Sequence, residues 1–258
     1  MDAGILLSWP VAVAAGAAIF VAGFAQGALG FGFPAISAPI LFLMMDVKTA
    51  IVLNLLPNFA VNLYSTFRGG HWRASLGLYW PVAAWVLVGS WLGATVLLMS
   101  PQEPIRLLLA LVIFAYLAQR QLARLDWSWL TGYPRVSAAA FGLAGGFFSG
   151  AVNLALPPLL IYFMLLGLGT QAMTQILNLC FLGGKTVQAA LLAGAGEIRL
   201  SAVLVNIPLT LVAFAGLALG LRLQTRFSGA QYQRLLRIFL FAVALLLIGQ
   251  AVWGWWGR

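Results

Sequence analysis

Long stretches without a charged residue constrain this chain more than any other feature. Residues 3–45, 74–102 and 136–184 contain no Asp, Glu, Lys or Arg. A transmembrane helix needs about 20 apolar residues, so two of these stretches are long enough for more than one crossing. Only 7% of the residues are charged, against about 25% in soluble domains. The chain is therefore predicted to be an integral membrane protein embedded in the lipid bilayer.

The apolar runs are continuous, which favours helices over barrel strands. Backbone polar groups in lipid must be paired within the protein, so only helices and closed barrels span a membrane. Barrel strands would alternate in polarity over about 10 residues. We therefore predict an all-α transmembrane bundle with about eight full spans and two short helices. The predicted segments are 7–29, 34–45, 49–67, 76–99, 104–122, 136–154, 157–168, 171–194, 200–221 and 234–256.

Two of these segments, 34–45 and 157–168, are too short to cross the membrane. Each covers about 18 Å at 1.5 Å per residue, little more than half of a hydrocarbon core of about 30 Å. Similar sequences precede them: residues 23–34 read GFAQGALGFGFP and residues 146–157 read GFFSGAVNLALP. The two short helices therefore occupy matching places in the chain.

This match indicates an internal repeat, with residues 1–125 and 126–258 as two transmembrane halves of one domain. Each half has five predicted segments, so the two halves are inverted relative to each other. Interrupted hydrophobic segments in corresponding positions are typical of secondary transporters, and they indicate a binding site near the middle of the membrane.

The basic residues support this topology. If each short helix reverses the chain, nine Lys or Arg residues fall on one side and four on the other, and the larger group is predicted to be cytoplasmic. The larger group is Arg68, Arg73, Arg120, Arg124, Arg135, Arg222, Arg226, Arg234 and Arg237, and the smaller is Lys48, Arg106, Arg199 and Arg258.

The Gly/Pro breaks are the first candidate for a binding site. Proline is favoured in the first turn of a helix because its missing N–H has no helical partner there. Helix N-termini carry about half a positive charge and bind anions, so two facing ends would form an anion site. An alternative is that the glycines serve tight helix packing. The candidate break and backbone-donor residues are Gly27, Gly30, Gly32, Pro34, Gly150 and Pro157.

These motifs resemble the TauE/SafE sulfite exporter family, also called the 4-toluenesulfonate uptake permease family. The resemblance covers most of the chain and is carried by GFAQGALGFGFPAISAPIL and its second copy, GLAGGFFSGAVNLALPPLL. The second copy departs from the family pattern at Asn153, Leu154 and Ala155, where the family has a Gly-rich run. The resemblance implies transport of sulfite, a sulfonate or another small sulfur-containing anion across a bacterial inner membrane.

Lys185 is the most informative single residue, because it lies well inside the predicted segment 171–194. A charged side chain there costs about 2.5–3.5 kcal/mol or more and indicates function. No acidic residue lies within a predicted span to pair with it, so an anionic substrate is the expected counter-charge. The alternative is that Lys185 extends to a membrane surface.

Amide and hydroxyl side chains inside the segments complete the predicted site. They can donate hydrogen bonds to an oxyanion, or they can join helices to one another. With Lys185, the predicted substrate-binding residues are Gln26, Asn54, Asn58, Ser149, Asn153 and Asn178.

Other functions are less well supported by the sequence. An anion channel would share the same lining, and an intramembrane hydrolase would need Ser149 activated by Lys185. The single histidine, His71, is too few for a zinc cluster, and we expect no metal, cofactor or nucleic-acid partner and no enzymatic activity. A homo-oligomer remains an open alternative to a monomer.

Overall fold

The computed structural model describes residues 9–68, 70, 72–122, 124–127, 129–224 and 229–256. His71, Arg226 and Arg258 lie outside these residues. The regular elements among them are all helices, and seven of these helices are long and apolar enough to cross a membrane. The prediction of an all-α, multi-spanning membrane protein is therefore confirmed.

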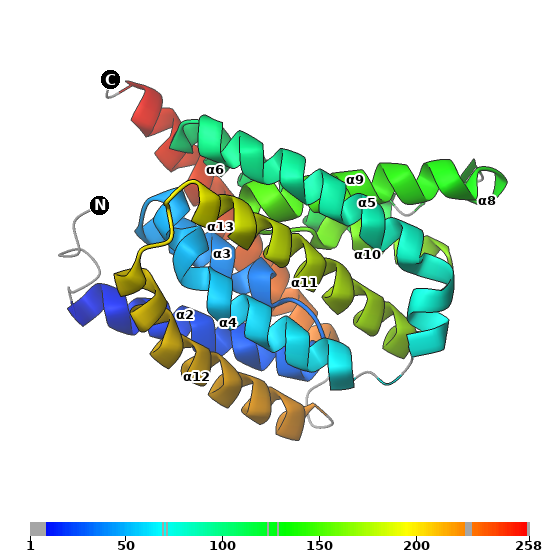
Figure 1. Cartoon of the computed structure of the whole chain (residues 1–258), viewed down its shortest axis with the longest axis horizontal. Helices are drawn as coiled ribbons and strands as arrows, with labels where there is room; N and C mark the ends of the chain where they lie inside the picture. The colour runs from blue at the N-terminus through cyan, green and yellow to red at the C-terminus, as the bar shows by residue number, and fades with distance from the viewer. Residues whose placement is uncertain are drawn as a thin grey trace.

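The elements follow one another in the order shown in Figure 1. The longer helices are α2 (Trp9–Leu29), α4 (Val47–Arg68), α5 (Trp72–Met99), α6 (Gln102–Leu117), α9 (Pro134–Val152), α11 (Thr170–Gly194), α12 (Leu200–Leu223) and α13 (Gly229–Trp256). Two single-turn helices, α7 (Gln119–Leu122) and α8 (Trp129–Gly132), connect α6 to α9. The predicted span 104–122 corresponds to α6, which has only 16 residues and is shorter than predicted.

The two short helices are present where the sequence predicts them. They are α3 (Phe33–Met44) and α10 (Leu156–Leu165), with 12 and 10 residues. Pro34 is the second residue of α3 and Pro157 is the second residue of α10. Proline therefore lies in the first turn of both helices, where its missing N–H has no helical partner.

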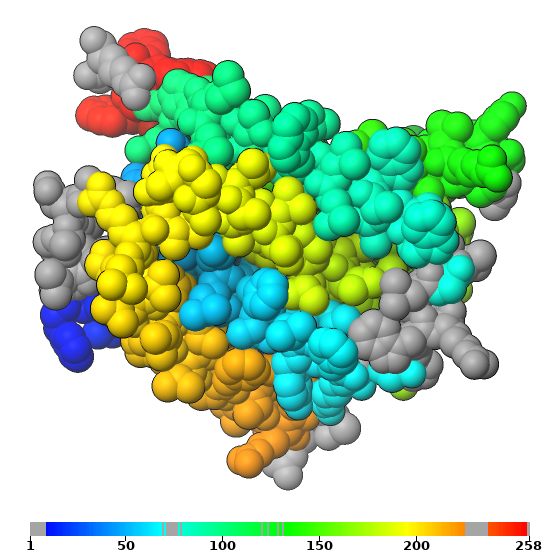
Figure 2. Space-filling model, in the orientation of Figure 1, coloured from blue at the N-terminus to red at the C-terminus, as the bar shows by residue number. Residues whose placement is uncertain are grey.

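Helices from the first half of the chain pack against helices from the second half. α2 packs on α12, α5 on α9, α4 on α11, and α6 on α13. Figure 1 shows α2 beside α12, and it shows α4 and α11 running in opposite directions through the middle of the bundle. In the space-filling view, the cyan and blue surface of α4 lies between α11 and α12 (Figure 2). This pairing is what two inverted repeats would produce, although the repeat boundaries themselves remain a prediction.

Gly27 and Gly150, which the sequence analysis assigned to the breaks, lie inside α2 and α9 instead. A Cβ atom on Gly27 would lie 2.3 Å from the carbonyl oxygen of Leu217, and one on Gly150 would lie 2.3 Å from that of Ser90. Such short distances mean that the helix backbones touch, as small residues allow in membranes. The packing explanation is therefore correct for these two glycines.

Candidate functional site

The two breaks match in backbone geometry at one position. Gly30 and Asn153, 123 residues apart, have φ angles of 83° and 63°. The residues that immediately precede the short helices differ, since Gly32 has a φ angle of 117° and Ala155 one of −84°. Asn153 is the one non-glycine residue with positive φ among the described residues. Asparagine enters this left-handed region more readily than most residues because its short polar side chain bonds locally. Asn153 thus takes the left-handed conformation that Gly30 takes at the first break.

The N-terminus of α3 is already occupied by a side chain of the protein. The N–H of Phe33 donates to Gln26 Oε1 at 3.0 Å, and the N–H of Ala35 donates to the Gly32 carbonyl at 3.0 Å. Pro34, between them, has no N–H. The expected backbone donors around Pro34 are thus paired within the protein, because Gln26 accepts the N–H of Phe33 and the Gly32 carbonyl accepts that of Ala35.

The N-terminus of α10 is also poor in donors, for a different reason. Pro157 and Pro158 are its second and third residues, and neither has a backbone N–H. The end of α10 can attract an anion through the helix dipole, but it offers few hydrogen bonds. Side chains, rather than helix ends, must supply most donors for a bound anion here.

Gln26 also joins the first break to α11. Its Nε2 donates to Asn178 Oδ1 at 2.7 Å, to Ser65 Oγ at 3.1 Å and to the Gly30 carbonyl at 3.2 Å. Asn178 Nδ2 in turn donates to the Gly30 carbonyl at 2.8 Å and to the Thr174 carbonyl at 2.7 Å. Two predicted site residues, Gln26 and Asn178, are therefore in direct contact, and they connect the two halves of the chain.

Lys185 is buried inside α11, with a relative exposure of 2%. Its ammonium group donates to Gln188 Oε1, and Gln188 Nε2 donates to the carbonyls of Gly150 at 2.7 Å and Ser149 at 3.3 Å. Lys185 lies within the candidate span Thr170–Gly194, and its side chain is buried rather than extended to the surface of the bundle. Gln188 holds it beside the second break.

Three asparagines follow one face of α4. Asn54, Asn58 and Asn62 are four residues apart, and each has a relative exposure of 0%. Asn62 Nδ2 donates to Asn58 Oδ1 and to the Asn58 carbonyl. Both amide atoms of Asn54, Nδ2 of Asn58 and Oδ1 of Asn62 have no hydrogen-bond partner in the protein. An unpaired buried polar group costs about 1–3 kcal/mol, so these amides are prepared to bind something polar.

Lys185 lies at the level of these asparagines. Gln175 Nε2 on α11 donates to the Thr66 carbonyl on α4 at 3.3 Å, and the two helices are antiparallel (Figure 1). Lys185 is ten residues beyond Gln175, or about 15 Å along the helix. The same distance back from Thr66 along α4 falls between Asn54 and Asn58. The register thus places the charge and the unpaired amides at one depth in the bundle.

Asn153 contributes a further unpaired amide at the second break. Its side chain has 2% relative exposure, and neither Nδ2 nor Oδ1 has a partner. Ser149, one turn earlier on α9, is also buried at 2%. A Cβ atom on Gly184 would lie 2.6 Å from Ser149 Oγ, so this hydroxyl lies against α11 next to Lys185.

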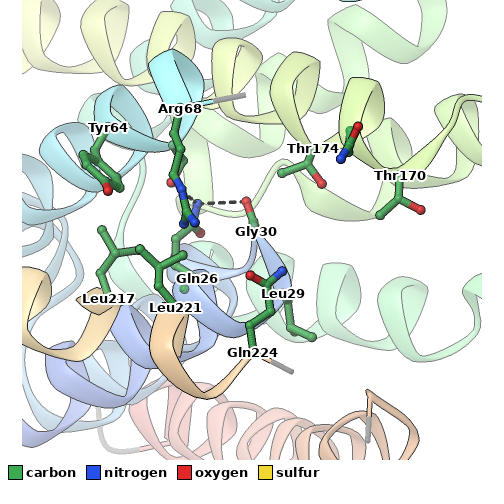
Figure 3. Close-up of a pocket in the computed structure, with 13 residues that line it drawn as sticks. Gln26, Leu29, Gly30, Tyr64, Arg68, Thr170, Thr174, Leu217, Leu221 and Gln224 are labelled. Carbon is green, nitrogen blue, oxygen red and sulfur yellow. Dashed lines mark hydrogen bonds between the residues drawn. The ribbon is translucent and has the colours of Figure 1, made fainter. Parts of the chain in front are cut away.

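A cavity of about 250 Å³ adjoins the first break. Figure 3 shows the Arg68 side chain extending from the end of α4 toward Gln26 and Gly30. The other polar lining residues are Tyr64, Ser65, Thr170, Gln171, Thr174 and Gln224. Sequence reasoning used Arg68 only for orientation and missed the cavity. A signal was available, because Ser65 lies three residues after Asn62 and continues the polar face of α4.

The structure therefore separates the predicted residues into two groups. Gln26 and Asn178 meet at the first break, whereas Lys185 and Ser149 lie at the second. Among the described residues, no group of three or more His, Cys, Asp or Glu side chains could hold a metal ion.

Comparison with known proteins agrees with the resemblance seen in the motifs. No curated protein and no solved structure matches the chain. The family described as "Sulfite exporter TauE/SafE" matches residues 15–247, nearly the whole chain. This protein therefore belongs to the TauE/SafE sulfite exporter family.

Proposed function

We propose that the protein is a secondary transporter of a small anion, with sulfite, a sulfonate or another sulfur-containing oxyanion as the substrate. One observation carries the proposal: Lys185 is buried in the middle of α11, and its hydrogen-bond partner is the neutral side chain of Gln188. The described acidic residues lie in the first turn of α6 or between helices, at Asp46, Glu103, Asp126 and Glu197. A substrate anion is then the natural counter-charge for Lys185.

Each group at this depth has a distinct role in the proposal. Lys185 supplies the positive charge, and Gln188 holds it in place. The unpaired amides of Asn54, Asn58 and Asn153 donate hydrogen bonds to the oxygens of the anion. Hydrogen bonds to a charged group contribute about 1.5–3 kcal/mol each after the exchange with water is counted, so a few of them would favour binding of a small anion.

Gln26, Asn178 and Ser149 have a supporting role in the same proposal. Gln26 and Asn178 close the first break, and Ser149 lies beside Lys185 at the second. Alternating access would rock one half of the chain against the other, as in transporters built from inverted repeats. The predominance of basic residues at the Arg68 end of the bundle supports an orientation in a bacterial inner membrane with that end facing the cytoplasm.

The hydrolase alternative has no supporting contact. A Ser–Lys pair requires the amine within hydrogen-bond reach of the hydroxyl. Lys185 instead donates to Gln188, which donates to the backbone carbonyls of Ser149 and Gly150 and not to the Ser149 hydroxyl. An anion channel would use the same polar lining. It differs from a carrier in its kinetics, because channel fluxes do not saturate at low substrate concentration.

The test is uptake of labelled sulfite into liposomes that contain the wild type, Lys185→Gln or Lys48→Gln. Lys48→Gln is the matched control, because it also removes one lysine charge. Lys48 lies outside the bundle centre and pairs with Glu197 at 2.8 Å. We expect saturable uptake by the wild type, a loss of about 10- to 100-fold in Lys185→Gln, and near wild-type uptake in Lys48→Gln. Equal uptake by all three proteins would refute a role for Lys185, and unsaturable uptake would favour a channel.

A further inference from the structure

The cavity at the first break is separate from the Lys185 region. Arg68 ends α4 two residues after Thr66, the residue that contacts Gln175. In the antiparallel register Arg68 is therefore level with residue 173 of α11, twelve residues from Lys185. This corresponds to about 18 Å along the helix, too far for one small anion to touch both side chains.

The contact between Gln26 and Asn178 lies between the two places. Gln26 lines the cavity, and its Nε2 binds Asn178 Oδ1 at 2.7 Å. Asn178 is buried at 0% relative exposure and lies seven residues before Lys185 on α11. An anion in the cavity would therefore have to displace this amide pair before it could move toward Lys185.

The cavity has the chemistry of an oxyanion site. Arg68 is exposed to solution at its mouth, and no acidic side chain is among the described residues that line it. Guanidinium groups bind planar and tetrahedral oxyanions with paired hydrogen bonds. The hydroxyls of Ser65 and Thr174 and the amide of Gln224 provide neutral donors nearby. Since a water molecule takes about 30 Å³ in the liquid, about 250 Å³ holds a small anion with some of its hydration.

We propose that this cavity is a second anion site, an access site in which Arg68 holds a sulfur oxyanion before the pair of Gln26 and Asn178 opens. The proposal rests on the proposed transport function for the identity of the anion. It does not rest on Lys185, because the cavity, its charge and its opening to solution are independent of that residue. The alternative for Arg68 is a purely topological role, as one basic residue among several at this end of the bundle.

The experiment measures the electrostatic potential of the cavity with thiol reagents. The single native cysteine, Cys180, has 1% relative exposure, so the wild type gives the background. In Thr174→Cys, the labelling rate of a methanethiosulfonate carrying a sulfonate group is compared with that of one carrying a trimethylammonium group. We expect the sulfonate reagent to be favoured, and the ratio of rates to fall roughly three- to tenfold when Arg68→Gln is added.

Arg222→Gln is the matched control. Arg222 is exposed near the end of α12 and does not line the cavity, so its loss removes one charge from the same end of the bundle. We expect it to leave the ratio nearly unchanged. Methanesulfonate and sulfate should slow labelling when Arg68 is present and not when it is replaced. Sulfite is unsuitable as the protecting anion because it reacts with thiosulfonates.

Several results would overturn the proposal. One is an equal fall in the ratio for Arg68→Gln and Arg222→Gln, which would show only the general charge of this end. Another is the absence of protection by either anion. If Thr174→Cys does not fold, Ser65→Cys in the same cavity serves the same purpose. If neither reagent labels either cysteine, the cavity is closed to solution and the proposal is wrong.

Labelling requires no transport, so the two proposals can fail separately. Lys185→Gln should leave the labelling ratio and the protection unchanged. If Arg68-dependent protection is absent while sulfite uptake is intact, the access site is refuted and the carrier proposal stands. If protection is intact but no anion is taken up, the cavity binds anions and the transport proposal is refuted.

Discussion

The two breaks share a left-handed residue, Gly30 in one and Asn153 in the other, but differ in what surrounds it. At the first, Gln26 caps α3 and binds Asn178, and a cavity with Arg68 lies outside. At the second, the amide of Asn153 is unpaired, two prolines lie in the first turn of α10, and Lys185 is held nearby through Gln188. The two breaks therefore have chemically different surroundings. One is closed by amide pairs and borders solution, and the other is buried, charged and incompletely paired.

The helix packing, in contrast, is nearly the same in both halves. α2 contacts α12 through Gly27, and α9 contacts α5 through Gly150, and at both glycines an added Cβ would lie 2.3 Å from a backbone oxygen of the partner helix. The helix packing is thus alike in both halves, whereas the side chains at the breaks differ. The following changes test this comparison, from the largest expected effect to the smallest.

Alanine at Gly27 or Gly150 should have the largest effect and should act equally in both halves. The added methyl group meets a backbone oxygen, which cannot rotate away, so the paired helices must separate. We expect a loss of about 1–3 kcal/mol or more in each variant, measured as a lower temperature of half-loss of the monodisperse peak in size-exclusion chromatography. Gly16→Ala in α2 is the control, because nothing lies within 4 Å of its added Cβ. A strong effect at only one of the two glycines would contradict the symmetry of the packing.

The breaks themselves should respond differently to the exchange of Gly and Asn. Asn153→Gly keeps the left-handed turn and removes only the unpaired amide, so we expect a nearly unchanged melting temperature and sulfite uptake lower by about tenfold. Asn153→Val should instead destabilise the protein by about 1–2 kcal/mol, because a branched side chain is strained at this φ angle. Unchanged uptake in a well-folded Asn153→Gly protein would remove this amide from the site.

The opposite exchange, Gly30→Asn, sharpens the same comparison. A Cβ atom on Gly30 would lie 2.7 Å from Thr174 Cγ2, so the side chain of Thr174 must move and the cavity must change shape. We expect a lower melting temperature than in Asn153→Gly, measured in the same chromatographic assay. A Gly30→Asn protein as stable as the wild type would show that the first break has as much free space as the second.

The sequence predicted the features that depend on local chemistry. The charge-free stretches, the two short helices and the burial of Lys185 all follow from hydropathy and from the positions of Gly and Pro. The hydrogen bond from the Phe33 N–H to Gln26 Oε1 was not predicted. The two residues are seven positions apart, and they meet only because the chain turns at the break between α2 and α3. The roles of Gly27 and Gly150 were misassigned for a similar reason: a helix-packing glycine and a break glycine look alike until the partner helix is placed.

The smallest expected effect concerns the amide pair that closes the first break. In a double-mutant cycle of Gln26→Ala and Asn178→Ala, we expect a coupling free energy of about 0.5–1.5 kcal/mol, typical of hydrogen bonds between transmembrane helices. The control cycle combines Asn178→Ala with Gln188→Ala, which lie ten residues apart on α11, or about 15 Å, and should be additive. Both cycles are measured by thermal unfolding in one detergent. Equal coupling in the two cycles would mean that α11 responds as a whole, and the first break would then have no separate closing contact. Coupling confined to Gln26 and Asn178 would mean that this contact can open without disturbing the group around Lys185, as an access step before transport requires.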